Sequence, residues 1–177
     1  TTRLVGSEMC IRDSSDFADV SERIQYLVTQ VEEITKIDNF GAYLTAMLEI
    51  DAFFMNEDRH TNNIAVIYNE KTQKYELSPF FDQGLCMFAD INQDYPIDQS
   101  LEYCLEKIEA KPFSSDFDIQ LDAAEELYGI QIGFQFTFKD IQIYLQKNSE
   151  NYPREVIRRV EQLLRGQMRK YGYLMKK

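Results

Sequence analysis

The chain has 177 residues, 44% of them hydrophobic, which is enough for one globular domain with a sizeable core. Its formal net charge of -11 argues against a general nucleic-acid binder, so we expect no nucleic-acid partner. Residues 151–177 carry a net charge of +6 and residues 1–150 carry -17. We interpret the basic C-terminal segment as the solvated face of a helix.

The cysteine and histidine content narrows the setting further. Cys10, Cys86 and Cys104 lack metal-binding spacing, and their odd number without a signal peptide predicts a reducing, cytoplasmic location. Cys86 and Cys104 are expected to be small core residues. His60 is the only histidine, which argues against zinc hydrolase chemistry. Because no apolar run approaches the ~20 residues that span a bilayer, we expect no membrane partner.

Residues 1–14 show no helical or strand period, and part of this segment resembles translated adapter sequence. We therefore predict that residues 1–14 are non-native or disordered and set them aside from the fold. The natural sequence is expected to start near Ser15, in the middle of a longer protein.

Two helices are predicted before the middle of the chain. Residues 17–37 place apolar side chains at helical spacing, with Asp19 or Ser21 as the cap. Residues 40–54 form the second helix, which leads into a polar loop at residues 56–63.

A β-hairpin is predicted next, from residues 64–69 and 76–81. In an antiparallel hairpin the numbers of paired residues have a constant sum. A turn centred between Thr72 and Gln73 gives a sum of 145, which places Asn63 directly opposite Asp82.

The remaining chain is predicted to be mainly helical, so the fold class is α+β, mainly α, with a central hairpin. Helices are expected at residues 98–110 and 117–128, the second capped by Ser114 or Ser115 and ended by Gly129. An extended piece follows at 130–136. Thr137 and Asp140 form a capping box for a helix to about residue 147, and a last helix starts at residues 151–153.

Three polar residues around the hairpin have the types that phosphoryl transfer uses. A carboxylate at Asp58 can orient an acceptor hydroxyl and take its proton. Asn63 and Asp82 offer the hard oxygen ligands that Mg²⁺ prefers, and Mg²⁺ would carry ATP. Ordinary turn chemistry is the alternative interpretation of each residue taken alone. Their order with an intervening hairpin favours a catalytic site with Asp58 as base and Asn63 and Asp82 as metal ligands.

Further residues are expected to support this loop. Asn56 is interpreted as a brace, and Gly84 as the end of a tight turn after Asp82. His60 is interpreted as a structural hydrogen-bonding residue rather than a base. Arg59 is left open between pairing with a nearby acid and contacting phosphate.

The segment 51–84 resembles the catalytic segment of the HipA-like serine/threonine protein kinases, and its D-R-H-x-x-N order is more distantly similar to phosphatidylinositol kinases. Glu57 and Ser78 depart from the pattern of the most similar branch, where threonine and alanine are common. The matching positions are Asp51, Asn56, Asp58, Arg59, His60 and Asn63, then Ser78, Pro79, Phe81, Asp82 and Gly84.

The resemblance implies the C-terminal lobe of a kinase that uses ATP and Mg²⁺ to phosphorylate a protein. It also implies Asp58 as base and Asn63 and Asp82 as metal ligands. The sequence has no G-x-G-x-x-G loop, so we expect the ATP-gripping N-terminal lobe to be absent and the isolated lobe to be inactive. Two alternatives stay open, namely a non-catalytic module that binds a partner such as an antitoxin, and a lipid kinase lobe.

Overall fold

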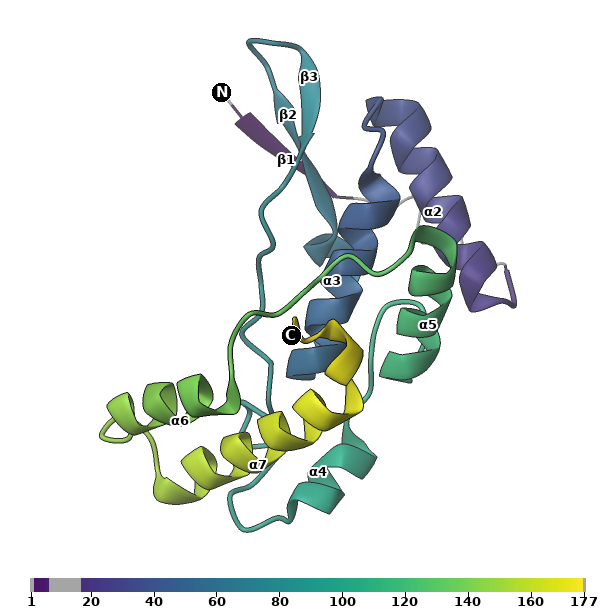
Figure 1. Cartoon of the computed structure of the whole chain (residues 1–177). Helices are drawn as coiled ribbons and strands as arrows, with labels where there is room; N and C mark the ends of the chain where they lie inside the picture. Colours follow the sequence, from purple (N-terminus) through teal and green to yellow (C-terminus); the bar gives the residue numbers. More distant parts are fainter. Residues whose placement is uncertain (1, 7–16, 177) are drawn as a thin grey trace.

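The computed structural model describes residues 2–6 and 17–176, and over these the chain is α+β and mainly helical, as predicted (Figure 1). A small three-stranded sheet lies at one end of the molecule, and helices make up the rest. The strands are β1 (Thr2–Gly6), β2 (Ala65–Asn69) and β3 (Lys74–Leu77); the α-helices are α2 (Val20–Thr35), α3 (Phe40–Phe54), α4 (Leu101–Lys107), α5 (Phe117–Tyr128), α6 (Phe138–Lys147) and α7 (Arg154–Lys170).

Strands β2 and β3 form the predicted hairpin, but β3 lies at residues 74–77 and not at the predicted 76–81, and the register differs from the prediction. Val66 pairs with Leu77, so paired numbers sum to 143 and not to 145. The centre of the turn lies one residue earlier than predicted, between Lys71 and Thr72, because the Asn69 side chain accepts hydrogen bonds from the N–H groups of these two residues. Gln73 closes this turn in the left-handed region, with φ of 54°. The predicted placement of Asn63 directly opposite Asp82 is therefore wrong.

The third strand, β1, comes from the segment that was set aside. Thr2–Gly6 pairs antiparallel with β2, which gives the order β1-β2-β3. Disorder, one of the two alternatives for residues 1–14, is therefore wrong for Thr2–Gly6, whereas their non-native origin stays a prediction. Cys10 and the rest of residues 7–16 lie outside the described residues.

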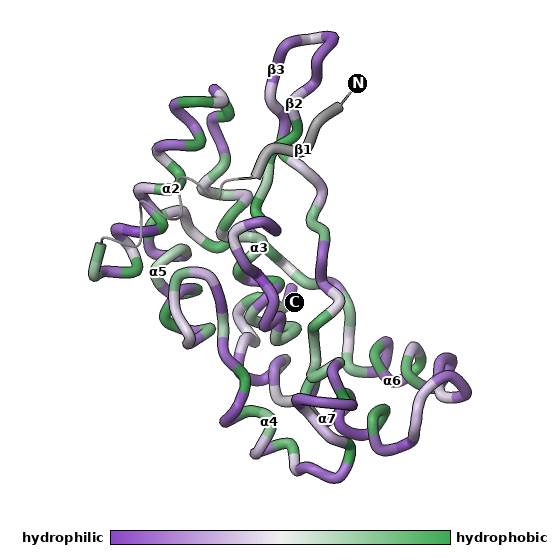
Figure 2. The backbone as a smooth tube through the Cα atoms, turned by 180° about the vertical axis from the view of Figure 1, so that it is seen from behind, coloured by the Kyte–Doolittle hydropathy of each residue, from purple (hydrophilic) through white to green (hydrophobic). Residues whose placement is uncertain are grey.

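Figure 2 shows that the tip of the hairpin formed by β2 and β3 is hydrophilic.

The helices agree closely with the local sequence signals. Helices α3 and α5 begin and end at the predicted residues. Asp19 caps α2, and Thr137 with Asp140 forms the predicted capping box of α6. The cap of α5 is Asp116, which replaces the predicted serines because its carboxylate accepts two N–H groups of the first turn. Helix α4 is shorter than predicted and starts after Ser100, whose hydroxyl caps it.

Helix α3 lies at the centre of the fold and carries much of the core (Figure 1). Helices α2 and α5 pack on it, and α7 also contacts it. The close approach of α5 requires a glycine, because a Cβ on Gly41 would lie 2.5 Å from the ring of Tyr128. Cys104 is fully buried, as predicted, and Cys86 is half-buried.

The chain between α5 and α6 is extended, as predicted, and crosses α3 (Figure 1). Phe134 forms an isolated parallel bridge with Met175 near the C-terminus. Glu49, a buried residue of α3, accepts hydrogen bonds from the N–H groups of Gln131 and Ile132, at 2.8 and 2.6 Å. This carboxylate fixes the start of the connection to the centre of the fold.

Candidate functional site

The candidate site is built on a buried ion pair between the end of α3 and the polar loop. The guanidinium of Arg59 donates from Nε to Oδ2 of Asp51 at 2.6 Å and from Nη2 to Oδ1 at 3.0 Å. Both side chains are almost completely shielded from solvent. The structure therefore resolves the role of Arg59, which pairs with Asp51 and is not available to contact phosphate.

The same guanidinium ties the two ends of the hairpin together. Nη1 of Arg59 donates to the backbone carbonyl of Asn63 at 3.1 Å and to that of Phe81 at 3.0 Å. The chain that enters the hairpin and the chain that leaves it are thus held by one nitrogen. The Asn63 and Asp82 segments lie beyond the last strand pair, Val66 with Leu77, and the Arg59 side chain holds their backbones together there.

Asn56 braces the loop, as predicted. Its side-chain amide donates to Oδ1 of Asp51 at 2.8 Å, and its Oδ1 accepts the backbone N–H of Asp58 at 3.2 Å. The residue is fully buried, and Met55 before it takes the left-handed conformation that ends α3. Asp58 is therefore positioned through Asn56 by the same carboxylate that binds Arg59.

Asp58, His60 and Asp82 converge at the surface of this frame. Their ligand atoms all lie within 4.8 Å of one another, among the residues that the structure describes. Asp58 and His60 are half-buried and Asp82 is exposed, and His60 Nε2 lies 3.9 Å from Asp58 Oδ1. Two carboxylates and an imidazole at this spacing can hold a divalent cation.

Asn63 lies beside this cluster with a structural bond of its own. Its side-chain nitrogen donates to the backbone carbonyl of Asp58 at 2.9 Å, and the residue is almost fully buried. This bond closes the loop 58–63 and leaves the amide nitrogen turned toward the backbone. The role of Asn63 as a metal ligand stays a prediction.

The turn after Asp82 differs from the expectation for Gly84. Asp82 itself takes the left-handed conformation, with φ of 56°. A Cβ added at Gly84 would meet no heavy atom within 4 Å, so neither crowding nor a positive φ requires glycine there. Gly84 lines a cavity instead, together with Gln83.

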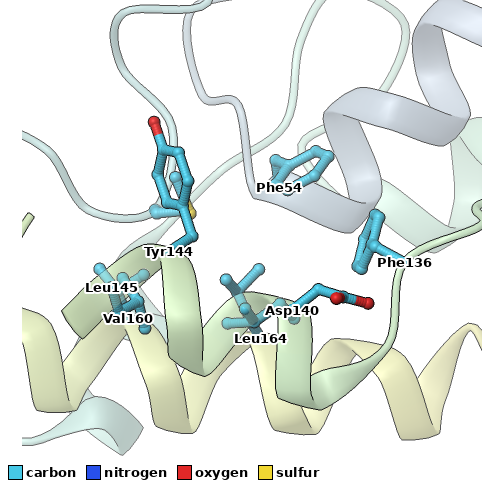
Figure 3. Close-up of a pocket in the computed structure, with 9 residues that line it drawn as sticks. Phe54, Phe136, Asp140, Tyr144, Leu145, Val160 and Leu164 are labelled. Carbon is cyan, nitrogen blue, oxygen red and sulfur yellow. The ribbon is translucent and has the colours of Figure 1, made fainter. Parts of the chain in front are cut away.

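Two neighbouring cavities of about 370 Å³ each lie on this side of the molecule. The first is lined by Gln83, Gly84 and side chains of α6 and α7. In the second, Phe54 and Phe136 lie across from Tyr144, and the floor is formed by α6 and α7 (Figure 3). Both have largely apolar linings, and Asp140 is the one charged residue that lines the second cavity.

A smaller polar pocket includes Glu57, the residue before Asp58, in its lining. The hydroxyl of Tyr95 donates to Glu57, and burial raises the pKa of this carboxyl above its usual value. Lys111 brings its Nζ to 3.9 Å from Asp58 Oδ1. The pocket has a volume of about 160 Å³ and is lined by Glu57, Asp94, Tyr95, Lys107, Glu109 and Lys111.

Sequence reasoning did not identify Lys111 as a site residue. It is separated from Asp58 by a hairpin and a helix, and Lys111 followed by Pro112 reads locally as the end of a helix. No local signal distinguishes it from the other lysines, because its place beside Asp58 depends on how distant segments pack.

Comparisons with known proteins do not identify the chain. No family model matches it, and searches of curated proteins and of solved structures give no significant match. Among the described residues, no helix has both the length and the apolar character needed to cross a bilayer.

Proposed function

We propose that this chain carries the acceptor and metal half of an ATP- and Mg²⁺-dependent kinase site, which transfers phosphate to a serine or threonine hydroxyl of a protein. The observation that carries the proposal is the convergence of Asp58 and Asp82 at the open end of the hairpin. Their oxygens lie within 4.8 Å of each other although the residues are separated by two strands. The resemblance of segment 51–84 to HipA-like kinases supports the same assignment.

In this proposal Asp58 accepts the proton of the attacking hydroxyl and orients its oxygen. The residue is half-buried, so an acceptor side chain can reach it while its backbone is held by Asn56. Phosphoryl transfer requires little covalent chemistry from the protein, and positioning of this kind accounts for most of the catalysis.

The donor set fits a divalent cation. Asp82 offers an exposed carboxylate and Asn63 an amide, and the backbones of their segments are joined through Arg59. Bound Mg²⁺ would supply charge neutralisation for the β- and γ-phosphates of ATP. His60 adds a nitrogen donor, which suits Mn²⁺ better than Mg²⁺.

Phosphate transfer from γ-labelled ATP tests the proposal, with the natural protein that contains this chain. The variants Asp58→Asn and Asp82→Asn keep side-chain size and remove the charge, and both are expected to lower transfer at least a hundredfold. Asp122→Asn, an exposed residue of α5, is the matched control and should transfer like the wild type. Undiminished transfer in either site variant would remove the assignment.

Metal binding separates the kinase from a partner-binding module. Titration of the chain with Mn²⁺, followed by the loss of the free-ion electron paramagnetic resonance signal, should show one site that Asp82→Asn weakens. A chain that binds Mn²⁺ in this way but gives no ATP-dependent transfer in the natural protein would favour the non-catalytic module. Transfer to phosphoinositide vesicles without transfer to protein would favour the lipid kinase.

A further inference from the structure

Lys111 approaches the catalytic cluster from a part of the chain remote in sequence. Its Nζ lies 3.9 Å from Asp58 Oδ1, and its side chain is 52% exposed. This separation is at the outer limit of an ion pair, so the ammonium lies near Asp58 without forming a close hydrogen-bonded pair with it. The side chain keeps donors free to bind a second anion.

The backbone at Lys111 is held in place by a buried side chain. The amide of Gln120, a buried residue of α5, donates to the Lys111 carbonyl at 3.1 Å, while its oxygen accepts the N–H groups of Phe113 and Ser114. Ala110 and Phe113 are buried on either side of the lysine. The structure thus presents the flexible stem of Lys111 from a fixed point at the rim of the site.

The carboxylates of the cluster and a bound phosphoryl group are all negatively charged, so a nearby cation would stabilise the phosphoryl group there. A transferred phosphoryl group spreads negative charge over its oxygens, next to the carboxylates of Asp58 and Asp82. Arg59, the cation nearest in sequence, is buried in its pair with Asp51 and cannot reach the surface. Preorganised lysine or arginine groups at such positions stabilise the charge that develops during transfer.

We propose that Lys111 is a catalytic residue whose ammonium binds the non-bridging oxygens of the phosphoryl group during its transfer at Asp58; this inference rests on the proposed function. The acceptor oxygen forms a bond to the γ-phosphorus while the bond from the γ-phosphorus to the bridging oxygen breaks. ADP leaves with that electron pair, and the hydroxyl proton goes to Asp58. Lys111 forms no covalent bond and exchanges no proton.

The competing explanation is an ordinary surface ion pair, which contributes little to stability and nothing to binding. The two explanations differ in what Lys111→Met should change. If Lys111 forms only a surface pair, its substitution changes the free energy of unfolding slightly and leaves polyphosphate affinity unchanged. If its ammonium binds phosphate, the substitution lowers the affinity for a polyphosphate. Methionine keeps the length of the stem, and Lys111→Arg keeps the charge.

Isothermal titration of the chain with tripolyphosphate in saturating Mg²⁺ tests the proposal, because this probe needs the metal and the cation but no base-binding lobe. Lys111→Met is expected to weaken binding about tenfold, as for loss of one charge-assisted phosphate contact. Lys111→Arg should restore most of the affinity. Lys71→Met, at the exposed tip of the hairpin, is the matched charge control and should bind like the wild type.

A parallel titration with Mg²⁺ alone distinguishes the two proposals. Lys111→Met should bind Mg²⁺ at least as well as the wild type, because a positive charge beside Asp58 has been removed. Equal tripolyphosphate affinity in Lys111→Met and the wild type would overturn the role of Lys111 while leaving the proposed function in place. A wild-type chain that binds neither Mg²⁺ nor its tripolyphosphate complex would overturn both.

Discussion

Arg59 and Asp51 form a two-pronged ion pair inside the protein, with Arg59 Nε 2.6 Å from Asp51 Oδ2 and both side chains at most 1% exposed. Asp51 belongs to the last turn of α3, and Arg59 lies in the polar loop that follows α3. Because Arg59 also binds the carbonyls at both ends of the hairpin, this pair connects the helix to the sheet. The candidate site is built on top of it.

Removal of the buried guanidinium should strongly destabilise the fold. Arg59→Met leaves the Asp51 carboxylate buried without its partner, and we expect a loss of about 3–5 kcal/mol in the free energy of unfolding. Urea denaturation followed by circular dichroism measures this change. The double variant Asp51→Leu with Arg59→Met should be less destabilised than Arg59→Met alone, because no unpaired charge remains.

The exposed ion pair between Lys107 and Asp94 provides the control. Lys107→Met should leave the urea midpoint close to that of the wild type, because solvent screens this pair. Similar losses of unfolding free energy in Lys107→Met and Arg59→Met would show that burial of the ion pair does not determine how much its removal destabilises the protein.

His60 should influence which metal the cluster selects. We expect His60→Gln to weaken Mn²⁺ binding about tenfold and Mg²⁺ binding less than twofold, because an imidazole nitrogen suits Mn²⁺ better than Mg²⁺. Competition of Mg²⁺ against bound Mn²⁺ in electron paramagnetic resonance gives both affinities. An equal loss for the two ions would contradict a ligand role for His60 and indicate that it only shapes the loop.

Glu49 should make stability depend on pH. Burial raises the pKa of Glu49 from 4.5 to about 7, although its bonds to the N–H groups of Gln131 and Ile132 oppose the shift. The folded state therefore holds this proton more tightly than the unfolded state. Its contribution to stability is complete below pH 4.5, falls as pH rises toward 7, and is lost above that, a change on the order of 3 kcal/mol.

The variant Glu49→Gln isolates this effect. It keeps an acceptor oxygen for the connection and cannot ionise, so the difference in unfolding free energy between wild type and variant should change between pH 4.5 and 7. Urea denaturation at five or six pH values measures that difference. Glu33→Gln, an exposed residue of α2, serves as control, and a flat difference curve for Glu49→Gln would contradict the expectation.

The hairpin turn gives a test of the observed register. Gln73 has φ of 54°, a left-handed conformation that is strained for a residue with a Cβ and not for glycine. Gln73→Gly should therefore stabilise the protein by about 0.5–1 kcal/mol in thermal or urea unfolding. Thr72→Gly, whose backbone is not left-handed, should destabilise it. The opposite order of the two variants would indicate the turn centre predicted from the sequence.

Much of the helical structure could be predicted because its signals are local. Thr137 and Gly129 act on backbone groups within four residues, and they predicted the start of α6 and the end of α5. Asp19 is one of the two predicted caps of α2, but that helix spans residues 20–35 and is shorter than the predicted 17–37. The approach of the Asn63 and Asp82 segments was also predicted, since a hairpin must return the chain to its starting point. The register was not, because the Asn69 side chain and the conformation of Gln73 moved the turn by one residue.

The sequence by itself determined the α+β, mainly helical class and the carboxylates of the candidate site, through periodicity, caps and the order of motifs. Only the tertiary structure decided that Arg59 pairs with Asp51, that His60 joins the two carboxylates, and that Lys111 lies at their side. The physical reason is the range of the interactions. Helix caps depend on neighbouring residues, whereas the partner of a charged side chain depends on how separate segments pack around a shared core.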